Sequence, residues 1–383
     1  MSAFEVGPEA ARRFALLMEN PTSPSGEITT PNEDVAGAAE PVVLPERLDA
    51  LAPEVRTGLD AYAASVDSTA LVVLHDGSLV HEWYAEGTGR ATLRPSQSMH
   101  KSLVGTIVLR CVADGVIPGL DASASTWLHE WDGDERSAIT VDHLLQMASG
   151  LEQPGMSMQP DAAGFQWLFG DDTTRVVLGY PAAEAPGARF DYNNLNSQAL
   201  GVLLERATGE RYASLLARLL WQPMGAAAAE VWLDSLGGQA ATSCCLNARA
   251  YDWALFGELL RTRGTVAGRA VVDPSIVDLL CEPSPSDACY ARQIWLGDGM
   301  DPSGSSTGGL PPVGRFTAAE PFAEPGTIVA CGFAGQRVYV ARESGVVLVR
   351  MGPPTGTPRF QQHWDNTLLL NTVVRAVTDQ PVS

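Results

Sequence analysis

The order of hydrophobic patterns along the chain is the feature that most limits its fold. Residues 69–84 (TALVVLHDGSLVHEWY) predict two strands joined by a tight turn at Asp76-Gly77, a pair of residues typical of hairpins. Two more strands are predicted around 336–342 and 346–351, while apolar residues in the middle of the chain recur at helical spacing. This order predicts an antiparallel sheet assembled from both chain ends with a helical insertion, rather than alternating βαβ units.

The same patterns divide the 383 residues into three regions and predict an α+β fold whose sheet is flanked by helices. Residues 1–64 are an N-terminal extension with a short helix over 8–19, a Pro- and Ser-rich lead-in expected on the surface, and a first larger helix. The α/β sheet domain takes 65–115 and 231–383, and the all-helical domain takes 116–230. Helices are predicted at 48–64, 98–117, 141–148, 165–179, 196–208, 212–220, 246–263, 273–280 and 367–377, and a long loop at 297–326.

Charge narrows the partners that such a protein can have. Asp and Glu total 45 against 25 Lys and Arg, which gives a formal net charge of −20. Such a surface repels phosphate backbones and anionic lipids, so we expect no nucleic-acid partner and no membrane partner. The N-terminus lacks the apolar core of a secretory signal, and no apolar run approaches the ~20 residues of a membrane helix. The sequence therefore predicts a cytoplasmic protein, and it assigns no oligomeric state.

A single lysine, Lys101, stands among 24 arginines. Arginine stays protonated in proteins whereas lysine can lose its proton, so a lone lysine draws chemical interest. Lys101 follows Ser98 by three residues at the start of a predicted buried helix, where positions i and i+3 lie about 5–6 Å apart on one face. The helix N-terminus and the interior both disfavour an ammonium ion, so a neutral Lys101 can accept the Ser98 proton. Ser98 and Lys101 are the candidate nucleophile and base.

A second polar segment, Tyr192-Asn193-Asn194, follows a Pro-Gly turn and precedes a predicted helix. A phenol close to an ammonium ion is easier to ionise, so Tyr192 is the candidate that relays a proton to the leaving group. Asn194 is expected to hydrogen-bond Lys101 or the substrate. Taken alone, the segment is equally well explained by a Tyr and an Asn that cap a helix.

A third segment, GFAGQ at 332–336, enters the strand predicted to follow it. Small residues such as Gly335 would let a substrate lie along the strand edge. The backbone N–H of Gln336 is expected to join that of Ser98 in an oxyanion hole. Taken alone, the segment is also explained as a glycine-rich entry to a strand.

In this order, the three segments resemble the β-lactamase-related serine hydrolases, whose signature is Ser-x-x-Lys, a Ser or Tyr motif, and Lys-Thr-Gly on a strand. Ser98 and Lys101 match the first element, and Tyr192 with Asn194 matches the Tyr-x-Asn form of the second. Phe333-Ala334-Gly335 stands in the place of the third.

The resemblance covers roughly residues 65–377, and HLLQMASGL (143–151) is similar to the branch that holds class C β-lactamase-like 6-aminohexanoate-oligomer hydrolases and carboxylesterases. It implies a β-lactamase/transpeptidase-like fold, with the active site between the sheet domain and the helical domain.

The third element departs from the family pattern, because a chain whose only lysine is Lys101 has no Lys-Thr-Gly, and neither His-Thr-Gly nor Arg-Thr-Gly replaces it. β-Lactamases and penicillin-binding proteins use that cation and hydroxyl to hold the substrate carboxylate. The resemblance therefore implies a serine hydrolase that acts through an acyl-enzyme on a small linear amide or ester, without cofactor or metal. The alternatives are a β-lactamase or D-Ala-D-Ala carboxypeptidase, and a non-catalytic binding relative.

Three other features of the sequence have simple explanations. The six cysteines, including the adjacent Cys244 and Cys245, are expected to be buried, reduced thiols. The six histidines show no zinc spacing, and His100 is expected to face away from Ser98. Residues 304–308 (GSSTG) match Gly-x-Ser-x-Gly but lack the strand before and the helix after that this motif needs.

Overall fold

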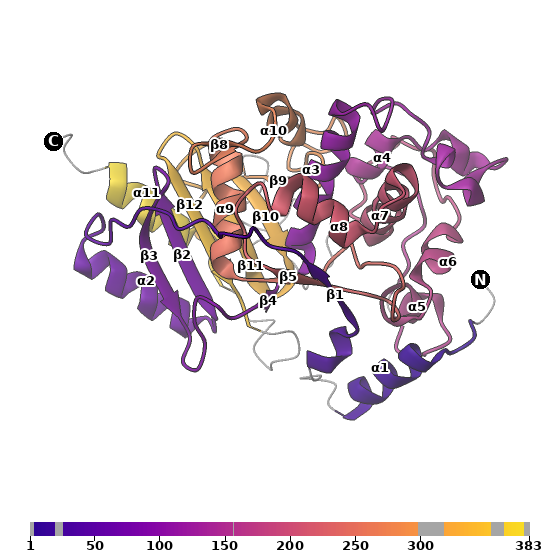
Figure 1. The fold of residues 1–383 in the computed structure, drawn as a ribbon, viewed down its shortest axis with the longest axis horizontal. Coiled ribbons are helices and arrows are strands. Elements are labelled where there is room, and N and C mark those ends of the chain that lie inside the picture. The colour runs from indigo at the N-terminus through magenta and orange to yellow at the C-terminus, as the bar shows by residue number, and fades with distance from the viewer. Residues whose placement is uncertain (1–3, 20–25, 156, 298–317, 354–363, 379–383) are drawn as a thin grey trace.

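A six-stranded antiparallel sheet is the main framework of the computed structural model, which describes residues 4–19, 26–155, 157–297, 318–353 and 364–378 (Figure 1). The strand order β3-β2-β12-β11-β10-β9 places the first strands beside the last ones, as the sequence predicts. These strands are β2 (Ala70–His75), β3 (Ser78–Tyr84), β9 (Trp295–Leu296), β10 (Ile328–Gly332), β11 (Gln336–Ala341) and β12 (Val346–Met351).

Each face of this sheet has its own hydrophobic cluster, because successive residues of a strand point to opposite faces. Val72 and Val347 belong to the cluster that includes helix α9 (Ala250–Arg261). Leu71 and Leu348 belong to the other cluster, with helices α2 (Pro53–Ser65) and α11 (Leu368–Thr378). The sheet therefore lies between two helical layers (Figure 1). Burial on both faces explains why these strands are nearly continuous runs of apolar residues.

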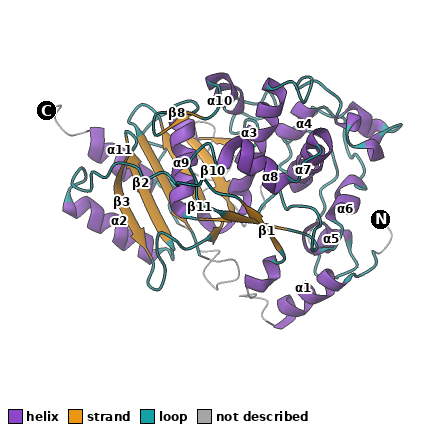
Figure 2. Ribbon diagram, viewed as in Figure 1, coloured by secondary structure: helices purple, strands orange, loops and turns teal. Residues whose placement is uncertain are grey.

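The helices from the middle of the chain gather beyond one edge of the sheet (Figure 2). Helix α3 (His100–Ala113) is buried along most of its length and lies where these helices meet the sheet (Figure 1). Gln293 joins three of the neighbouring segments: its carbonyl accepts from Ser102 Oγ at 2.9 Å and its side chain from Ser197 Oγ at 2.5 Å, while its Nε2 donates to Leu145 O at 2.9 Å. The other helices here are α4 (Val141–Leu145), α5 (Ala163–Phe169), α6 (Thr173–Leu178), α7 (Asn194–Thr208), α8 (Tyr212–Leu216) and α10 (Pro274–Leu280).

A second sheet of four short strands goes beyond the sequence-based prediction. Its order is β1-β5-β6-β4, and its strands are β1 (Asn32–Val35), β5 (Ala229–Trp232), β6 (Leu246–Ala248) and β4 (Arg94–Pro95). Strand β6 takes the first residues of the helix predicted at 246–263, so α9 begins only at Ala250. These strands depend on partners far away in the sequence, which local patterns do not show. Strand β4 ends just before Ser98 and fixes the chain there. A separate two-stranded hairpin pairs β7 (Thr265–Val266) with β8 (Arg269–Ala270).

Other boundaries differ from the prediction for local reasons. The helix predicted at 165–179 is divided into α5 and α6, because Asp172 caps α6 by accepting from the Arg175 N–H. Helix α2 starts at Pro53, since proline suits the first helical position. Residues 298–317, which include the 304–308 motif, lie outside the described residues. Among the helices that the structure describes, none has the length and apolar character needed to cross a membrane.

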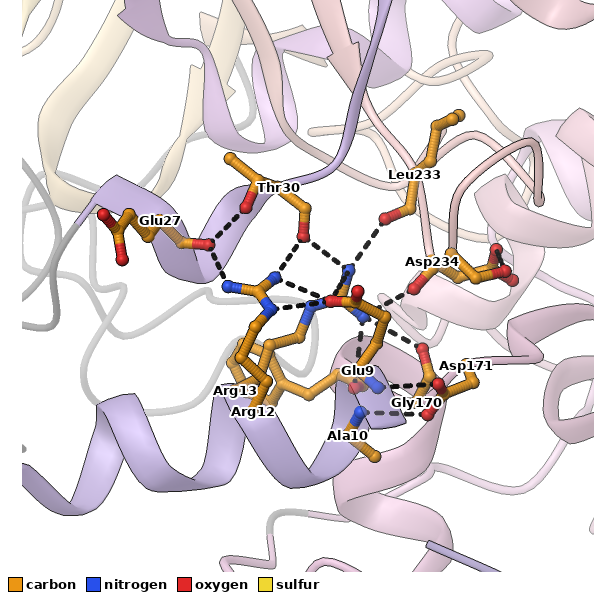
Figure 3. Close-up of polar contacts among 12 residues, drawn as sticks. Glu9, Ala10, Arg12, Arg13, Glu27, Thr30, Gly170, Asp171, Leu233 and Asp234 are labelled. Carbon is orange, nitrogen blue, oxygen red and sulfur yellow. Dashed lines mark hydrogen bonds and ion pairs between the residues drawn. The ribbon is translucent and has the colours of Figure 1, made fainter. Parts of the chain in front are cut away.

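The N-terminal extension is docked into the fold and is not simply wrapped on its surface. Helix α1 (Pro8–Glu19) forms as predicted, and β1 joins the second sheet. The Arg13 side chain is fully buried and donates hydrogen bonds to several backbone carbonyls, among them those of Thr30, Leu233 and Asp234 (Figure 3). Burial lowers the Arg13 pKa to about 10, which still leaves the guanidinium charged at neutral pH.

Arg13→Met is expected to lower the free energy of unfolding by about 3 kcal/mol, because it leaves buried carbonyl groups without their donor. The measurement is urea unfolding followed by circular dichroism. The matched control is Arg12→Met, since the neighbouring Arg12 side chain is 35% exposed and should contribute less than about 1 kcal/mol. Equal, small losses for both variants would mean that the docking of α1 does not depend on the buried guanidinium.

Candidate active site

Ser98 lies in a single 3-10 turn, Gln97–Met99, immediately before helix α3. Gln97 has a φ of 49°, a left-handed conformation that is unfavourable for a residue other than glycine. Just upstream, the Ser96 N–H donates to Leu246 O at 2.9 Å and the Leu246 N–H donates to Ser96 Oγ at 3.2 Å. The turn therefore presents the partly exposed Ser98 from a backbone that the second sheet holds in place.

Lys101 is the second residue of α3, and its amine meets the Ser98 hydroxyl. Its Nζ lies 2.8 Å from Ser98 Oγ, as expected for side chains three positions apart on one helical face. The amine also donates to the backbone carbonyl of Ser243 through a short hydrogen bond. The Lys101 side chain is only 1% exposed, whereas Ser98 is partly exposed. A buried amine thus contacts a hydroxyl that a substrate can reach.

Burial lowers the pKa of Lys101 to about 7, from an ordinary value of 10.5. Removal of water disfavours the ammonium form, and burial is the single cause of the shift. A substantial share of the molecules therefore holds a neutral amine at neutral pH. Such an amine can accept a proton from Ser98, which a permanently charged group cannot do.

Tyr192 lies in the extended segment before helix α7, and its ring centroid is 5.3 Å from Lys101 Nζ. Burial raises the pKa of Tyr192 above its ordinary value, and a hydrogen bond with the Ser98 side chain counteracts this only in part. The predicted ease of ionisation is therefore wrong, because burial outweighs the Ser98 hydrogen bond and the Arg337 charge, which favour the ionised phenol. A neutral phenol beside Ser98 is suited to donate a proton rather than to take one.

Aromatic residues that the sequence analysis does not single out hold the Tyr192 ring. Trp295 stacks on it with centroids 5.4 Å apart and an interplanar angle of 30°, and Tyr290 meets it edge-on at 5.9 Å. Phe190 packs against Tyr290 at 5.1 Å. The only hint of this cluster in the sequence is that Tyr290 and Trp295 lie close together in CYARQIW (289–295), a segment for which no helix or strand is predicted. This cluster restricts the orientation of the phenol.

Asn194 is the first residue of α7, while its neighbour Asn193 caps that helix by accepting from the Leu195 N–H at 3.0 Å. The helix-capping explanation of this segment thus holds for Asn193. Lys101 Nζ donates to Ser98 Oγ and to the Ser243 carbonyl, so among the described residues the hydrogen bond predicted between Lys101 and Asn194 does not form. A contact between Asn194 and the substrate stays a prediction.

Gly335 and Gln336 lie at the turn between β10 and β11, and their contacts are directed elsewhere than to Ser98. The Gln336 N–H donates to Phe333 O within the turn. The Gly335 carbonyl accepts from Arg350 Nη1 at 2.8 Å. The oxyanion role predicted for the Gln336 N–H therefore does not fit the structure, because the tight turn uses that donor itself.

Gly332, at the end of β10, is the residue of this segment that approaches the Ser98 turn. A Cβ on Gly332 would stand 2.4 Å from Ser96 O and 3.1 Å from Gln97 Cβ. Only glycine lets the strand come this close to the backbone before the nucleophile. The strand edge thus lies beside the candidate site as predicted, but the residue that makes the close approach is Gly332 and not Gly335.

His100 faces away from Ser98, as predicted. Its Nδ1 lies 2.8 Å from the Cys244 carbonyl and its Nε2 lies 2.8 Å from the Tyr212 hydroxyl. Burial lowers the His100 pKa to about 4, so the ring is neutral at physiological pH. A carbonyl can only accept, so Nδ1 carries the proton and Nε2 accepts from Tyr212. His100 therefore ties α3 to two neighbouring segments and takes no part in the proton transfer.

Cys244 and Cys245 are joined by a disulfide, so the prediction of free thiols is wrong for this pair. Two neighbouring cysteines are poorly placed to bind one metal ion together, but their sulfur atoms can still form a disulfide. Cys111, Cys281 and Cys331 carry free thiols. In the described part of the chain, no group of three or more His, Cys, Asp or Glu side chains is placed to hold a metal ion.

The sheet built from both chain ends, with helices on each face and an Ser-x-x-Lys pair at the start of a buried helix, defines the β-lactamase/transpeptidase-like fold. The sequence model of the family described as Beta-lactamase matches residues 55–372, which is most of the chain. The protein belongs to this family.

Two curated relatives have names that point to different substrates. The chain is 25% identical over 383 aligned positions to a 6-aminohexanoate-dimer hydrolase of Paenarthrobacter ureafaciens, with 95% of this chain and 90% of the relative covered. It is 34% identical over 151 positions to Esterase EstB of Burkholderia gladioli, a match that spans 35% of this chain and only 37% of that protein.

Solved structures confirm the fold. A Bacillus anthracis protein described as a "putative 6-aminohexanoate-dimer hydrolase" superposes with a TM-score of 0.73 at 21% identity, covering 92% of this chain and 93% of that one. A family VIII carboxylesterase superposes with a TM-score of 0.62 at 14% identity, covering 88% of this chain and 100% of that one. At these identities the likeness concerns the fold alone.

Proposed function

We propose that the protein is a serine hydrolase that acts through an acyl-enzyme on a small linear amide or ester. The observation that carries this proposal is the 2.8 Å contact between Ser98 Oγ and a Lys101 amine that is 1% exposed. Burial without an attracting charge keeps much of this amine neutral, and a neutral amine in hydrogen-bonding range is what a serine nucleophile needs.

Acylation follows from this geometry. Lys101 takes the Ser98 proton as Oγ attacks the carbonyl carbon, and the backbone N–H of Ser98 at the helix start faces the developing oxyanion. The new ammonium ion is stabilised by the Ser243 carbonyl and by the face of the Tyr192 ring. Tyr192 protonates the leaving amine or alcohol, and the proton on Lys101 restores the phenol. Water then attacks the acyl-enzyme with the same groups acting in reverse.

The amide or ester assignment rests on two supports. One relative is named a 6-aminohexanoate-dimer hydrolase and another an esterase. The strand beside Ser98 carries Cys331 and Gly332 near its end and no lysine. Arg337 is buried there, and its Nη1 already donates to Gly332 O and its Nε to Asn366 Oδ1. A cation directed at a substrate carboxylate, as β-lactamases and D-Ala-D-Ala carboxypeptidases require, is not supplied by these contacts.

A panel of substrates tests the assignment. Purified protein is assayed side by side with p-nitrophenyl esters of increasing acyl length, linear amides of 6-aminohexanoate, and nitrocefin. We expect hydrolysis of an ester or a linear amide and little hydrolysis of nitrocefin. Turnover of nitrocefin above that of every ester and amide would favour a β-lactamase. No turnover together with no labelling by a fluorophosphonate probe would favour a binding protein.

The value of kcat/KM is expected to rise with pH through about pH 7 and then to level off. The neutral form of Lys101 is the active one, its pKa is lowered to about 7, and so activity is lost as the pH falls below that value. The measurement is a rate profile between pH 5 and 9 at constant ionic strength with the best ester. A rate that still rises at pH 9, as for an unperturbed lysine, would contradict the role of Lys101 as base.

A further inference from the structure

The disulfide between Cys244 and Cys245 lies directly beside the acceptor of the Lys101 amine. Ser243, the preceding residue, takes the Lys101 hydrogen bond through its carbonyl. The next carbonyl, that of Cys244, takes the hydrogen bond of His100 Nδ1 at 2.8 Å. Two successive carbonyls of one segment thus contact two successive side chains of α3. The backbone at 243–245 therefore decides where the Lys101 amine is held.

Neighbouring elements hold both flanks of this segment. Before it, the Thr242 N–H donates to Gln198 Oε1 at 3.0 Å. At its end, the Cys245 carbonyl accepts from the Trp232 N–H at 3.2 Å. The turn between these flanks has Cys245 at a φ of 72°, which is unfavourable for a residue other than glycine. The bond between the two sulfur atoms closes a small ring across one peptide group and so retains that turn.

The disulfide lies in a small hydrophobic cluster of its own rather than in one of the large cores. Cys244 and Cys245 are 8% and 6% exposed and form a small apolar cluster with Trp232. A small hollow, lined in part by Trp232, Ala241 and Ser243, adjoins this cluster. A reagent reaches the sulfur atoms through the small exposed part of the two cysteines, and a change of the backbone there moves the carbonyl of Ser243, the preceding residue.

We propose that the Cys244–Cys245 pair is a redox modification site that acts on the Lys101 amine through the Ser243 carbonyl, with the disulfide as the form that supports base catalysis. Ser243 is then a positioning residue. The effect on hydrolysis rests on the function proposed above, whereas the effect on the Lys101 amine does not.

The chemical step is thiol–disulfide exchange with a small dithiol. A thiolate of the dithiol attacks one cysteine sulfur, the bond between Cys244 and Cys245 breaks, and a mixed disulfide forms. The second thiol of the reagent then displaces the protein thiol. Two electrons and two protons pass to the protein, which ends with two thiols, while the dithiol becomes a cyclic disulfide. Excess oxidised reagent reverses the reaction.

The single lysine makes the test direct. Protein labelled with [13Cε]lysine gives one lysine side-chain signal, that of Lys101, which is followed by NMR from pH 5 to 9. The titratable groups that face it are His100 and Tyr192, and neither changes charge in this range, because burial lowers the His100 pKa to about 4 and raises the Tyr192 pKa. A shift in the titration therefore reports on Lys101 itself.

Untreated protein, dithiothreitol-reduced protein and the Cys244→Ala/Cys245→Ala variant are compared. Mass spectrometry after alkylation should show this pair unmodified before reduction and doubly alkylated after it. We expect the Lys101 midpoint to rise by at least half a pH unit in the reduced protein and in the variant, since a looser turn admits water to the amine. Ester hydrolysis at pH 7 should then fall at least threefold in kcat with little change in KM, and recover on reoxidation.

The matched control is Cys281→Ala, which removes a free thiol and should respond to dithiothreitol as the parent protein does. The alanine pair at 244 and 245 should not respond to it at all. Alkylation of both cysteines in untreated protein, or an unchanged Lys101 signal after complete reduction, would overturn the proposal. Absence of hydrolysis in every form, with the Lys101 shift present, would count against the proposed function and leave the redox link supported.

Discussion

Replacement of Ser98 by alanine is expected to lower kcat by at least ~10⁴-fold on any ester that the protein hydrolyses, because no other group forms the acyl-enzyme. The same variant should give no covalent adduct with a fluorophosphonate probe, whereas the parent protein should carry the adduct on the peptide that contains Ser98. The Ser98 side chain is small and partly exposed, so its loss should leave the fold intact. Circular dichroism and the midpoint of urea unfolding check this.

Ser102→Ala is the matched control for this experiment. Ser102 lies one helical turn further along α3 and is buried, and its hydroxyl donates to the Gln293 carbonyl at 2.9 Å. Its loss should cost about 1 kcal/mol of stability and leave probe labelling unchanged. Normal turnover by Ser98→Ala, or an adduct on another residue of the parent protein, would place the nucleophile elsewhere.

Lys101→Met is expected to lower kcat/KM by about 10²–10⁴-fold, the usual contribution of a positioned general base. Methionine nearly fills the space of the lysine side chain and carries no charge, so the loss should be catalytic rather than structural. The parent protein must keep an amine whose pKa is about 7 in the fold and 10.5 when unfolded. The unfolded chain therefore binds the extra proton between these values, and the parent's stability rises with pH across that window.

This pH dependence separates the role of the amine from its effect on stability. Urea unfolding is measured at pH 6 and at pH 9. The free energy of unfolding of Lys101→Met should exceed that of the parent protein by the larger amount at pH 6, where burial of the protonated amine destabilises the parent most. Lys101→Arg keeps a charge that cannot be removed, so it should be inactive at every pH. Retained turnover in the arginine variant would mean that Lys101 acts only through its charge.

Strands β2, β3, β11 and β12 of the main sheet and the Ser98–Lys101 pair could be predicted from the sequence because they depend on local patterns, whereas β9 and β10 were not predicted. Apolar, β-favouring runs on both sides of an Asp-Gly turn mark the β2–β3 hairpin, and a spacing of three residues brings the Ser98 and Lys101 side chains together at the start of α3. The short strands β4, β5 and β6 were missed, since each is only two to four residues long and depends on a distant partner.

The surroundings of the candidate site were less predictable for physical reasons. The pKa of Tyr192 is governed by burial among Tyr290 and Trp295, which no local pattern reveals. The donor assigned to Gln336 was misplaced, because the turn after β10 is tighter than a regular strand entry and uses that N–H internally. The role of the Ser243 carbonyl could not be predicted, because every residue has a backbone carbonyl and the residue type does not show which one accepts a hydrogen bond.

The titration of Lys101 in unmodified, oxidised protein tests the central claim most directly. Lysine labelled with ¹³C at Cε reports one side chain, so its protonation is read without a substrate and without a mutation. A chemical-shift midpoint at about pH 7 is the predicted result. A midpoint near the ordinary 10.5 would show a charged amine at neutral pH and would contradict the account.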